Sequence, residues 1–364
     1  MPVYASGQSG QVGAVAQSAY QTPLTVTHFY EFLSENFQYV PAWLDGQGLK
    51  AGQAYNRATR TVVSQADVNG DLTMEFTSGE ASNAVADSMG FWIKYALGSA
   101  LVTPTVVLGT AFKQVHTNGS KAGQFLTVQV GRPQISGVTV QPFTYVGCKC
   151  TDFEFSCNDN QIAQLKLTFD GQTELTSTGL AAASYPTPNG LFSFANASVM
   201  TIGGTASTSA GETTIAGGSS LGSLVNGVVI TGSTPMKADR YGLGNAGLKG
   251  EPIENAIPTI TGTLSTEFFS RTELYDVFRG AGTTPLQIDF TKFDSAGNDA
   301  NGVAAGPNPY RLSWIFPAVR FKTASVNING PDVVPQSIGF QAYDDGTTNP
   351  VLQCKIVSKE SSAI

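Results

Sequence analysis

The sequence predicts a mostly-β protein with two related domains, each of which carries one helix. Three observations lead to this prediction. The chain has 364 residues, a length typical of two domains, and only 13% of them are charged. It contains 40 Gly and is rich in Thr, Ser, Val and Phe, which favour turns and pleated sheets. A short segment also recurs at a long interval, which indicates an internal repeat.

The repeated segment predicts one strand with a single buried face in each half of the chain. Residues 70–76, GDLTMEF, reappear as residues 262–268, GTLSTEF, at an offset of 192 positions (262 − 70). In both copies Leu and the residue two positions later alternate with polar neighbours. That alternation is the period of a half-buried strand.

Each copy is followed by a segment with helical periodicity. After the second copy, apolar residues recur at i, i+3 and i+4 from Leu274, and Gly280 ends the stripe. Ser270 opens a capping box of the S-x-x-E type at its start. After the first copy, residues 85–96 carry a similar stripe, and Gly98 stands where a C-terminal glycine belongs.

Two further segments continue the parallel between the halves. Residues 145–171 and 316–346 each read as strand, loop, strand and Asp-Gly turn. The order strand, helix, strand, strand thus occurs twice, and it places a domain boundary near residues 186–189. The predicted domains are residues 28–186 and 187–364. Chance similarity among Gly-rich β-segments is the alternative explanation.

The composition of three polar segments predicts that they lie outside the two domain cores. Residues 1–27 consist mainly of Gly, Ser, Gln, Ala and Thr, which predicts an extended N-terminal arm that orders only against something else. Residues 201–223 and 294–308 have the same character, and we expect them to be long flexible loops.

The charge of the chain argues against tight binding of nucleic acid. The net charge is -7, from 20 basic and 27 acidic residues, so no basic stripe is expected to displace counterions from DNA. The most apolar region, residues 91–112, contains Lys94, Gly98 and Pro104. A buried helix and strand explain it better than a membrane span.

Two patterns that suggest enzyme chemistry lack the context they require. Residues 242–247 fit a dinucleotide-binding fingerprint, but Gly250 and Pro252 follow at once and prevent a helix from starting, which predicts a flexible loop. Residues 218–222 fit a nucleophile elbow, yet both histidines of the chain precede the serine. We therefore predict no catalytic or cofactor-binding residues and no enzyme activity. An enzyme remains the minority alternative.

Two patterns that suggest metal binding are also unconvincing. Cys148 and Cys150 lie on one face of a predicted strand and Cys157 on the other, so the three do not converge on zinc, and with no export signal at the start of the chain we expect free buried thiols. Residues 67–71 begin like a calcium loop, but Ser78 stands where a bidentate Glu is needed. No metal site is predicted.

The order of these segments resembles the two-domain major tail tube proteins of long-tailed, non-contractile bacteriophages. The residues that carry the resemblance are 262–268, 272–280 and 317–346, introduced by residues 253–258. The resemblance extends over residues 26–357 and rests on order and duplication rather than on one motif.

This resemblance implies a β-sandwich or half-barrel in each domain and a structural role in the virion. Copies would close into rings, of three two-domain chains or of six chains, that stack into a hollow tube for passage of double-stranded DNA. The implied partners are further copies of the chain and the tape-measure, tail terminator and baseplate or tip proteins. Assembly would take place in the host cytoplasm, without a membrane.

The same reading assigns roles to individual segments. Phe153 and Phe155 share one face of a predicted strand, and Asp152 and Glu154 share the other, which we expect to face the channel. Residues 1–27, 101–123 and 201–223 are the candidates for contact between rings. A carbohydrate-binding β-sandwich and a capsid decoration protein are the alternative functions.

Overall fold

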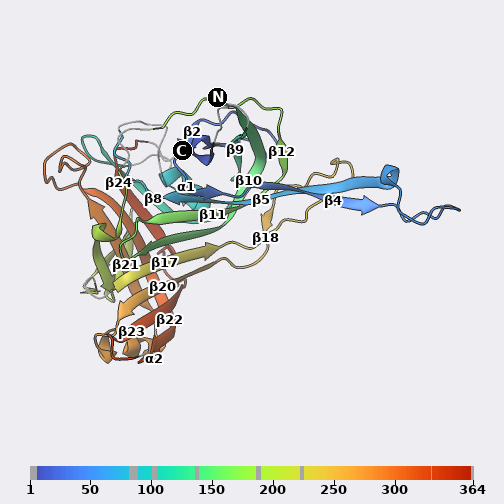
Figure 1. The fold of residues 1–364 in the computed structure, drawn as a ribbon. Coiled ribbons are helices and arrows are strands. Elements are labelled where there is room, and N and C mark those ends of the chain that lie inside the picture. The colour runs from blue at the N-terminus through green and yellow to red at the C-terminus, as the bar shows by residue number, and fades with distance from the viewer. Residues whose placement is uncertain are drawn as a thin grey trace.

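The computed structural model shows a mostly-β molecule with one long projecting hairpin (Figure 1). It describes residues 6–81, 89–100, 105–135, 139–185, 190–221, 225–328 and 330–361. The strands pack into a body, and the hairpin extends from that body as an arm. The mostly-β fold predicted from the sequence is confirmed.

Six strands in the first half of the chain form one hydrogen-bonded series, in the order β4, β5, β11, β10, β9, β1. Their bounds are β1 Gln11–Ala16, β4 Gln38–Asp45, β5 Thr61–Glu75, β9 Leu126–Pro133, β10 Val140–Asn158 and β11 Gln164–Gly171. The remaining elements of this half are β2 His28–Tyr30, β3 Ser34–Glu35, α1 Met89–Leu97, β6 Gly98–Ala100, β7 Thr105–Leu108, β8 Ala111–Asn118 and β12 Thr173–Leu175, with short 3-10 turns at Gly7–Ser9 and Ala58–Arg60.

Six strands in the second half form another series, in the order β17, β20, β23, β22, β21, β13. Their bounds are β13 Ala197–Ile202, β17 Val225–Ser233, β20 Thr259–Glu267, β21 Thr284–Lys292, β22 Tyr310–Val326 and β23 Pro335–Ala342. The other elements are β14 Thr205–Ser209, β15 Glu212–Ala216, β16 Ser219–Ser220, β18 Met236–Lys237, β19 Ile253–Glu254, α2 Asp276–Gly280 and β24 Gln353–Ser358, with a 3-10 turn at Phe194–Asn196.

The two series match in strand order and in their irregularities. Each strand of the first series has a counterpart in the second that holds the same position both along the chain and in the sheet. In chain order, the counterparts of β1, β4, β5, β9, β10 and β11 are β13, β17, β20, β21, β22 and β23. Against β11, the register of β10 shifts after Cys150, and against β23 the register of β22 shifts after Phe321. A second shift occurs where β10 meets β9 and again where β22 meets β21. Bulges are specific features of a strand, so their repetition adds to the agreement in strand order.

The two series are joined into one sheet. Residues 152–158 of β10 pair antiparallel with residues 227–233 of β17. The joined sheet has eight strands in the order β4, β5, β11, β10, β17, β20, β23, β22. A second contact between the halves is the pairing of β24 with β8. The boundary predicted at residues 186–189 lies outside the described residues.

The core is continuous across the joint between the halves. Phe153 of the first series stacks on Trp314 of the second, with ring centroids 6.1 Å apart and an angle of 8° between the rings. Phe155 also lies against Trp314, at 5.2 Å, and is fully buried. Burying an aromatic side chain of this size contributes roughly 2–3 kcal/mol, so the joint is part of the folded core.

The helices differ in detail from the prediction. The part of the first helix that is described, α1, is followed directly by Gly98, whose φ of +94° fits the predicted C-terminal glycine. In the second half, a π-helical turn at Arg271–Tyr275 precedes α2, and Ser270 makes no side-chain capping bond, so the predicted capping box is wrong. The left-handed residue at the end is Ala281 and not Gly280.

Two of the polar segments are more ordered than predicted. Residues 11–16 form β1 between β2 and β9, and Val12 and Ala14 are fully buried there. Residues 11–16 are thus ordered against other strands, as expected, but they form a buried strand of the body and not part of an extended arm. Small residues in a central strand need no strong apolar pattern. Within residues 201–223, β14 and β15 form a hairpin. Residues 294–308 form no named strand or helix, but Asp294 and Asp299 accept backbone hydrogen bonds within them.

Candidate assembly surfaces and channel face

The eight-stranded sheet has one buried and one exposed face. On β10, Phe153 and Phe155 are buried, whereas Asp152 and Glu154 lie on the opposite face, as the alternation predicts. The neighbouring strands continue this polar face around a shallow hollow of about 250 Å³, whose lining includes Lys166, Thr168, Thr231, Ser233, Thr259 and Thr261. The exposed face is thus built mainly from hydroxyl and carboxylate groups.

The one basic side chain that lines this hollow is paired with a carboxylate. Lys166 Nζ lies 3.3 Å from Asp71 Oδ2. Burial acts to raise the pKa of Asp71, but hydrogen bonds from Thr168, Lys166 and Asn36 outweigh it and hold the pKa below its ordinary value. Within the described part of the chain, neither Asp152 nor Glu154 forms an ion pair. Among the residues that line the hollow, the one cation is therefore paired. Farther along the same sheet, Arg320 and Lys322 of β22 are exposed and form no ion pair within the described residues, but both lie over the ring of Tyr343.

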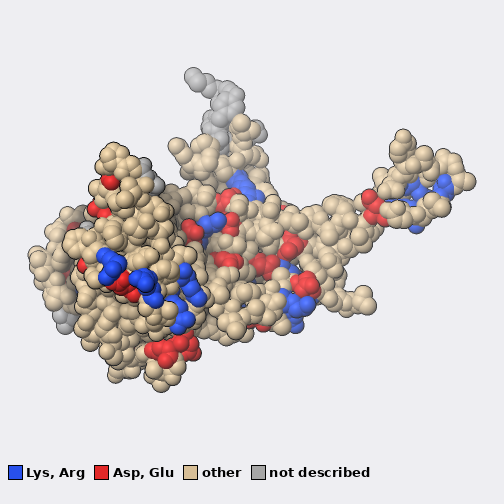
Figure 2. Space-filling model, turned by 90° about the horizontal axis from the view of Figure 1, so that it is seen from below, with Lys and Arg blue, Asp and Glu red and all other residues tan. Residues whose placement is uncertain are grey.

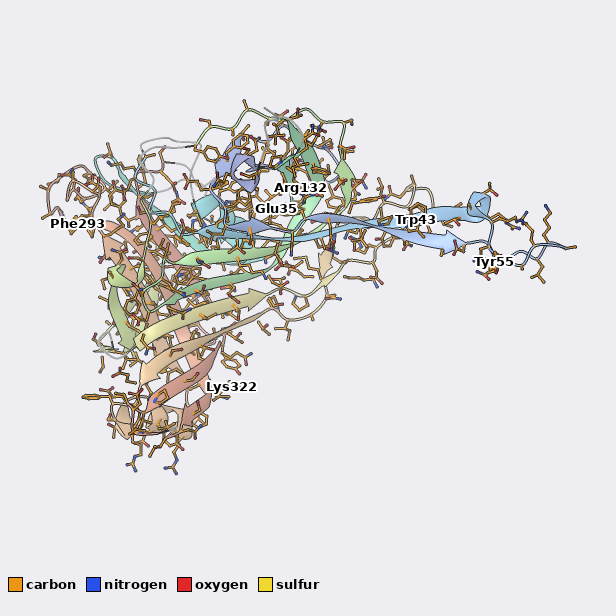
Figure 3. All side chains as sticks on the ribbon, viewed as in Figure 1. Glu35, Trp43, Tyr55, Arg132, Phe293 and Lys322 are labelled. Atoms are coloured by element: carbon orange, nitrogen blue, oxygen red, sulfur yellow. The ribbon has the colours of Figure 1, made fainter. Side chains whose placement is uncertain are left out.

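The arm is an extension of β4 and β5 past the neighbouring strand. β11 pairs with β5 only from Val68 onwards, and residues 41–66 project beyond it as the arm. Figure 3 shows Trp43 partway along the arm and Tyr55 near its tip. Trp43 is 63% exposed, Leu44 57% and Tyr55 90%. So much exposed apolar surface on one element marks an interaction site.

The arm also differs from the rest of the molecule in charge. Lys50, Arg57 and Arg60 lie near its tip, and Asp45 is the only acidic residue among residues 41–66. Figure 2 shows the basic side chains as a blue group close to the end of the arm. None of the three forms an ion pair within the described residues. The arm is basic and apolar on a molecule whose net charge is -7.

A segment of the second half braces the base of the arm. Lys249 is fully buried and pairs through Nζ with both Asp67 of β5 and Asp170 of β11. Tyr241 Oη donates to the backbone oxygen of Ala66 at 3.0 Å. Burial raises the pKa of Asp170 to about 6 although Lys249 opposes the rise. Burial also acts against the charge of Lys249, but the two carboxylates outweigh it and raise the pKa of Lys249.

The Gly-rich residues 242–247 belong to this brace. Gly247 has φ of +78°, its backbone oxygen accepts from Ala66 N, and an added Cβ would lie 2.6 Å from Ser64 O. Glycine is needed here because two backbones meet in a left-handed conformation. The prediction of a flexible loop is wrong, since this segment is held against β5.

Two strand edges at the ends of the eight-stranded sheet have no strand beside them in the described chain. β4 pairs only with β5, and after Val319 the strand β22 pairs only with β23. A cleft of about 560 Å³ runs along this part of β22, between residues 324–327 and a wall that includes Phe268 and Tyr275. Unpaired edges of this kind are ready to pair with another chain.

The four cysteines are free and buried. Cys157 was predicted on the opposite face from Cys148 and Cys150, but the bulge after Cys150 changes the alternation and all three are buried. Burial raises the pKa of both Cys150 and Cys157 to about 11. Over the described ranges, no group of three or more His, Cys, Asp or Glu side chains is arranged to hold a metal ion.

The other dismissed patterns have structural explanations. Asp67 and Asp71 of the calcium-like segment lie within β5, where Asp67 binds Lys249 and Asp71 binds Thr168, so they share no centre. Ser219 and Ser220 form the short strand β16 against β13. No described helix is long and apolar enough to cross a membrane.

A polar sheet face, two unpaired sheet edges and an exposed apolar arm are features of a protein that assembles with other chains. The comparison with known families agrees with this class. The model of the phage tail tube protein family matches residues 7–342, and the chain therefore belongs to that family. The resemblance recognised in the sequence is confirmed at this level. A comparison with curated proteins gives no match.

Proposed function

We propose that the chain is the repeating subunit of the tail tube of a long-tailed, non-contractile bacteriophage. Copies close into rings, the rings stack, and phage DNA passes through the hollow tube into the host. Membership of the phage tail tube protein family supports the part of this proposal that concerns the tail tube. The observation that carries the rest is the eight-stranded sheet, which spans both halves of the chain, exposes one polar face and ends in two free edges.

A ring of three chains accounts for the repeated strand order. The two series share their order and their bulges, which supports an internal duplication and therefore two equivalent units in each chain. Three such chains supply six units around a ring. Closing the sheet in this way removes the free edges, which open sheets otherwise leave exposed. A ring of six chains is the alternative.

The polar sheet face, with Asp152 and Glu154, is the proposed wall of the channel. Duplex DNA carries about one negative charge per 1.7 Å of its axis, so a wall with free cations would hold it by releasing counterions. On β10 and β11 the one Lys of the hollow is paired with Asp71, and Asp152 and Glu154 add negative charge. Around this hollow the wall would let DNA slide, because it offers the phosphates no unpaired cation.

The arm is the proposed contact between stacked rings. Strands of a barrel are tilted by roughly 35–45° from its axis, so a hairpin that outruns its neighbours passes the rim of the ring and reaches towards the next one. The arm carries exposed apolar side chains and unpaired basic residues, whereas the chain as a whole is acidic. The arm therefore replaces residues 1–27, 101–123 and 201–223 as our first candidate for this contact.

The remaining partners and the place of assembly follow from this role. The tape-measure protein would occupy the channel before DNA does, the tail terminator would close one end of the tube, and the baseplate or tip proteins would hold the other. A tube that polymerises on an initiator would be built in the host cytoplasm and end in the virion tail.

Electron microscopy of the purified chain tests the proposal. Negative staining at rising concentration, with and without tail-initiator complexes from a phage mutant that lacks this chain, is expected to show stackable rings or hollow tubes. Monomers under every condition would contradict the proposal and favour a carbohydrate-binding module. Binding to capsids instead of polymerisation would favour a decoration protein.

A further inference from the structure

We infer that neighbouring chains of a ring are joined by pairing residues 323–325 of β22 in one copy with residues 38–40 of β4 in the next. The pairing is antiparallel and repeats the register of the β10–β17 joint inside each chain. This inference rests on the proposed ring and names the strand edges that close it. It comes from the internal joint, which serves as a template for the joint between copies.

The two edges hold matching places in the two series. β10 is the fourth strand of the first series and β22 the fourth of the second, while β4 and β17 are the first strands. Inside the chain the fourth strand of one series pairs with the first strand of the other. The fourth strand of the second series and the first strand of the first series are left without such a partner, so each chain carries both halves of a second joint.

The register on β22 follows from the strand beside it. Leu167 of β11 lies opposite Phe153, and it also lies opposite Leu72 of the repeated segment. In the second series, Ile338 of β23 lies opposite Ala324 and opposite Leu264. Since Leu72 and Leu264 are the same position of the repeat, Ala324 corresponds to Phe153.

The register on β4 follows in the same way. Leu72 lies opposite Glu35 of β3, and Leu264 lies opposite Val228 of β17. Glu35 therefore corresponds to Val228, and four residues further on Tyr39 corresponds to Gly232. β4 continues the register of β3 against β5 through this stretch.

Combining the two correspondences places Ala324 opposite Tyr39 of the next copy. In the internal joint Phe153 lies opposite Gly232, and an added Cβ on Gly232 would lie 2.0 Å from the Phe153 ring. The large ring of one strand thus covers the bare backbone of the other. Between copies the same arrangement occurs with the sides exchanged, because the small residue is Ala324 and the large one is Tyr39.

The surroundings of Ala324 leave room for that ring. The cleft of about 560 Å³ beside residues 324–327 is walled by Phe268, Arg271 and Tyr275, and Tyr39 is 39% exposed in the isolated chain. On the other face, the register brings Ser325 opposite Gln38, both of them exposed and polar. A slip by one residue would reverse the two faces and break this match.

The pairing begins at Gln38 because the preceding residue is already bound. Phe37 O accepts from Arg132 Nη2 at 2.7 Å and from Tyr145 Oη at 3.1 Å, while Phe37 N donates to Glu35 Oε2 at 3.0 Å. Figure 3 shows Glu35 and Arg132 close together at the root of the arm. Pro41 lacks a backbone donor, as is usual on a strand edge, and limits the joint at its other end.

Disulfide trapping in assembled tubes tests the joint. The variant Gln38→Cys with Ser325→Cys places one thiol on each edge, at positions directly opposite in the inferred register, where Cβ atoms lie about 4.5–5.5 Å apart. Oxidation is expected to give covalent dimers and closed trimers on non-reducing gels. A slipped variant, Gln38→Cys with Thr323→Cys, has the same exposure and is expected to give about tenfold less product because its thiols are diagonal.

The internal joint provides the positive control. Glu154→Cys with Thr231→Cys occupies the equivalent positions of β10 and β17 and is expected to form a disulfide within one chain, assembled or not. The inference would be overturned if the Gln38→Cys, Ser325→Cys variant formed tubes but gave no cross-link, or no more cross-link than the slipped variant. That result would leave the proposed function unaffected. Absence of rings and tubes in the unmodified chain would instead overturn the proposed function.

Discussion

Lys249 is a charged residue that the fold buries completely. It is fully buried between Asp67 and Asp170, and it connects the second half of the chain to the base of the arm. A buried ion pair adds little by itself, but removing one partner leaves an uncompensated charge. The loss of Lys249 would therefore leave the carboxylates of Asp67 and Asp170 without a compensating charge.

We expect Lys249→Met to lower the free energy of unfolding by about 3–5 kcal/mol, because Asp67 and Asp170 then lack their cation. The matched control is Lys166→Met, because the Lys166 side chain is 46% exposed beside Asp71. An exposed pair of this kind contributes at most about 1 kcal/mol. Urea unfolding of both variants at neutral pH measures the difference, and equal losses would contradict the role given to Lys249.

The proposed role of Asp152 and Glu154 in the channel wall can be tested by reversing their charges. Asp152→Lys with Glu154→Lys is expected to slow DNA ejection, since new cations would bind phosphates in a salt-dependent way. Asp239→Lys with Asp332→Lys makes the same change in net charge at other exposed positions. Ejection from virions that carry each variant is the measurement, and an equal rate in both would remove these residues from the channel.

Residue-level prediction from the sequence succeeded where a strand keeps its period and failed where a bulge breaks it. The alternation of Phe153 and Phe155 with Asp152 and Glu154 is regular and was predicted. The common burial of Cys148, Cys150 and Cys157 depends on a bulge that no residue type announces. The pairing of Lys249 with residues far away in the chain leaves no local pattern at all.

Among the elements, the arm was not predicted from the sequence. Its apolar residues look like those of any partly buried strand, and a sequence does not show whether the chain itself or another copy covers them. The repeated strand and the helix after it were predicted, because alternation and helical spacing are local. β1 was missed since small residues carry a central strand there.

Shortening the arm tests its role in stacking. Asp45 and Thr61 are paired across the hairpin, so replacing residues 46–60 by Asn-Gly closes it with a two-residue turn. The body is expected to keep its stability within about 1 kcal/mol, because the tip makes no core contact. Made in the Gln38→Cys, Ser325→Cys background, the variant is expected to form cross-linked rings that do not stack. Tubes of normal length would contradict the role of the arm.

At the scale of the whole molecule, the chain contains one complete joint and the two halves of another. The order of elements and the family could be predicted from the sequence, since they depend on the succession of strands, helices and turns. The joint could not, because the pairing of β10 with β17 lies between segments with no shared motif. The register of the β10–β17 pairing is the basis for the inferred pairing between adjacent chains of the ring.

The most direct measurement of the central claim is a cryo-EM map of the assembled tube. We predict threefold rotational symmetry with an approximate sixfold repeat. The β22 and β4 edges of adjacent chains should be paired as β10 and β17 are. A ring of six chains, or a ring whose adjacent chains meet through other surfaces with both edges left open, would contradict the account.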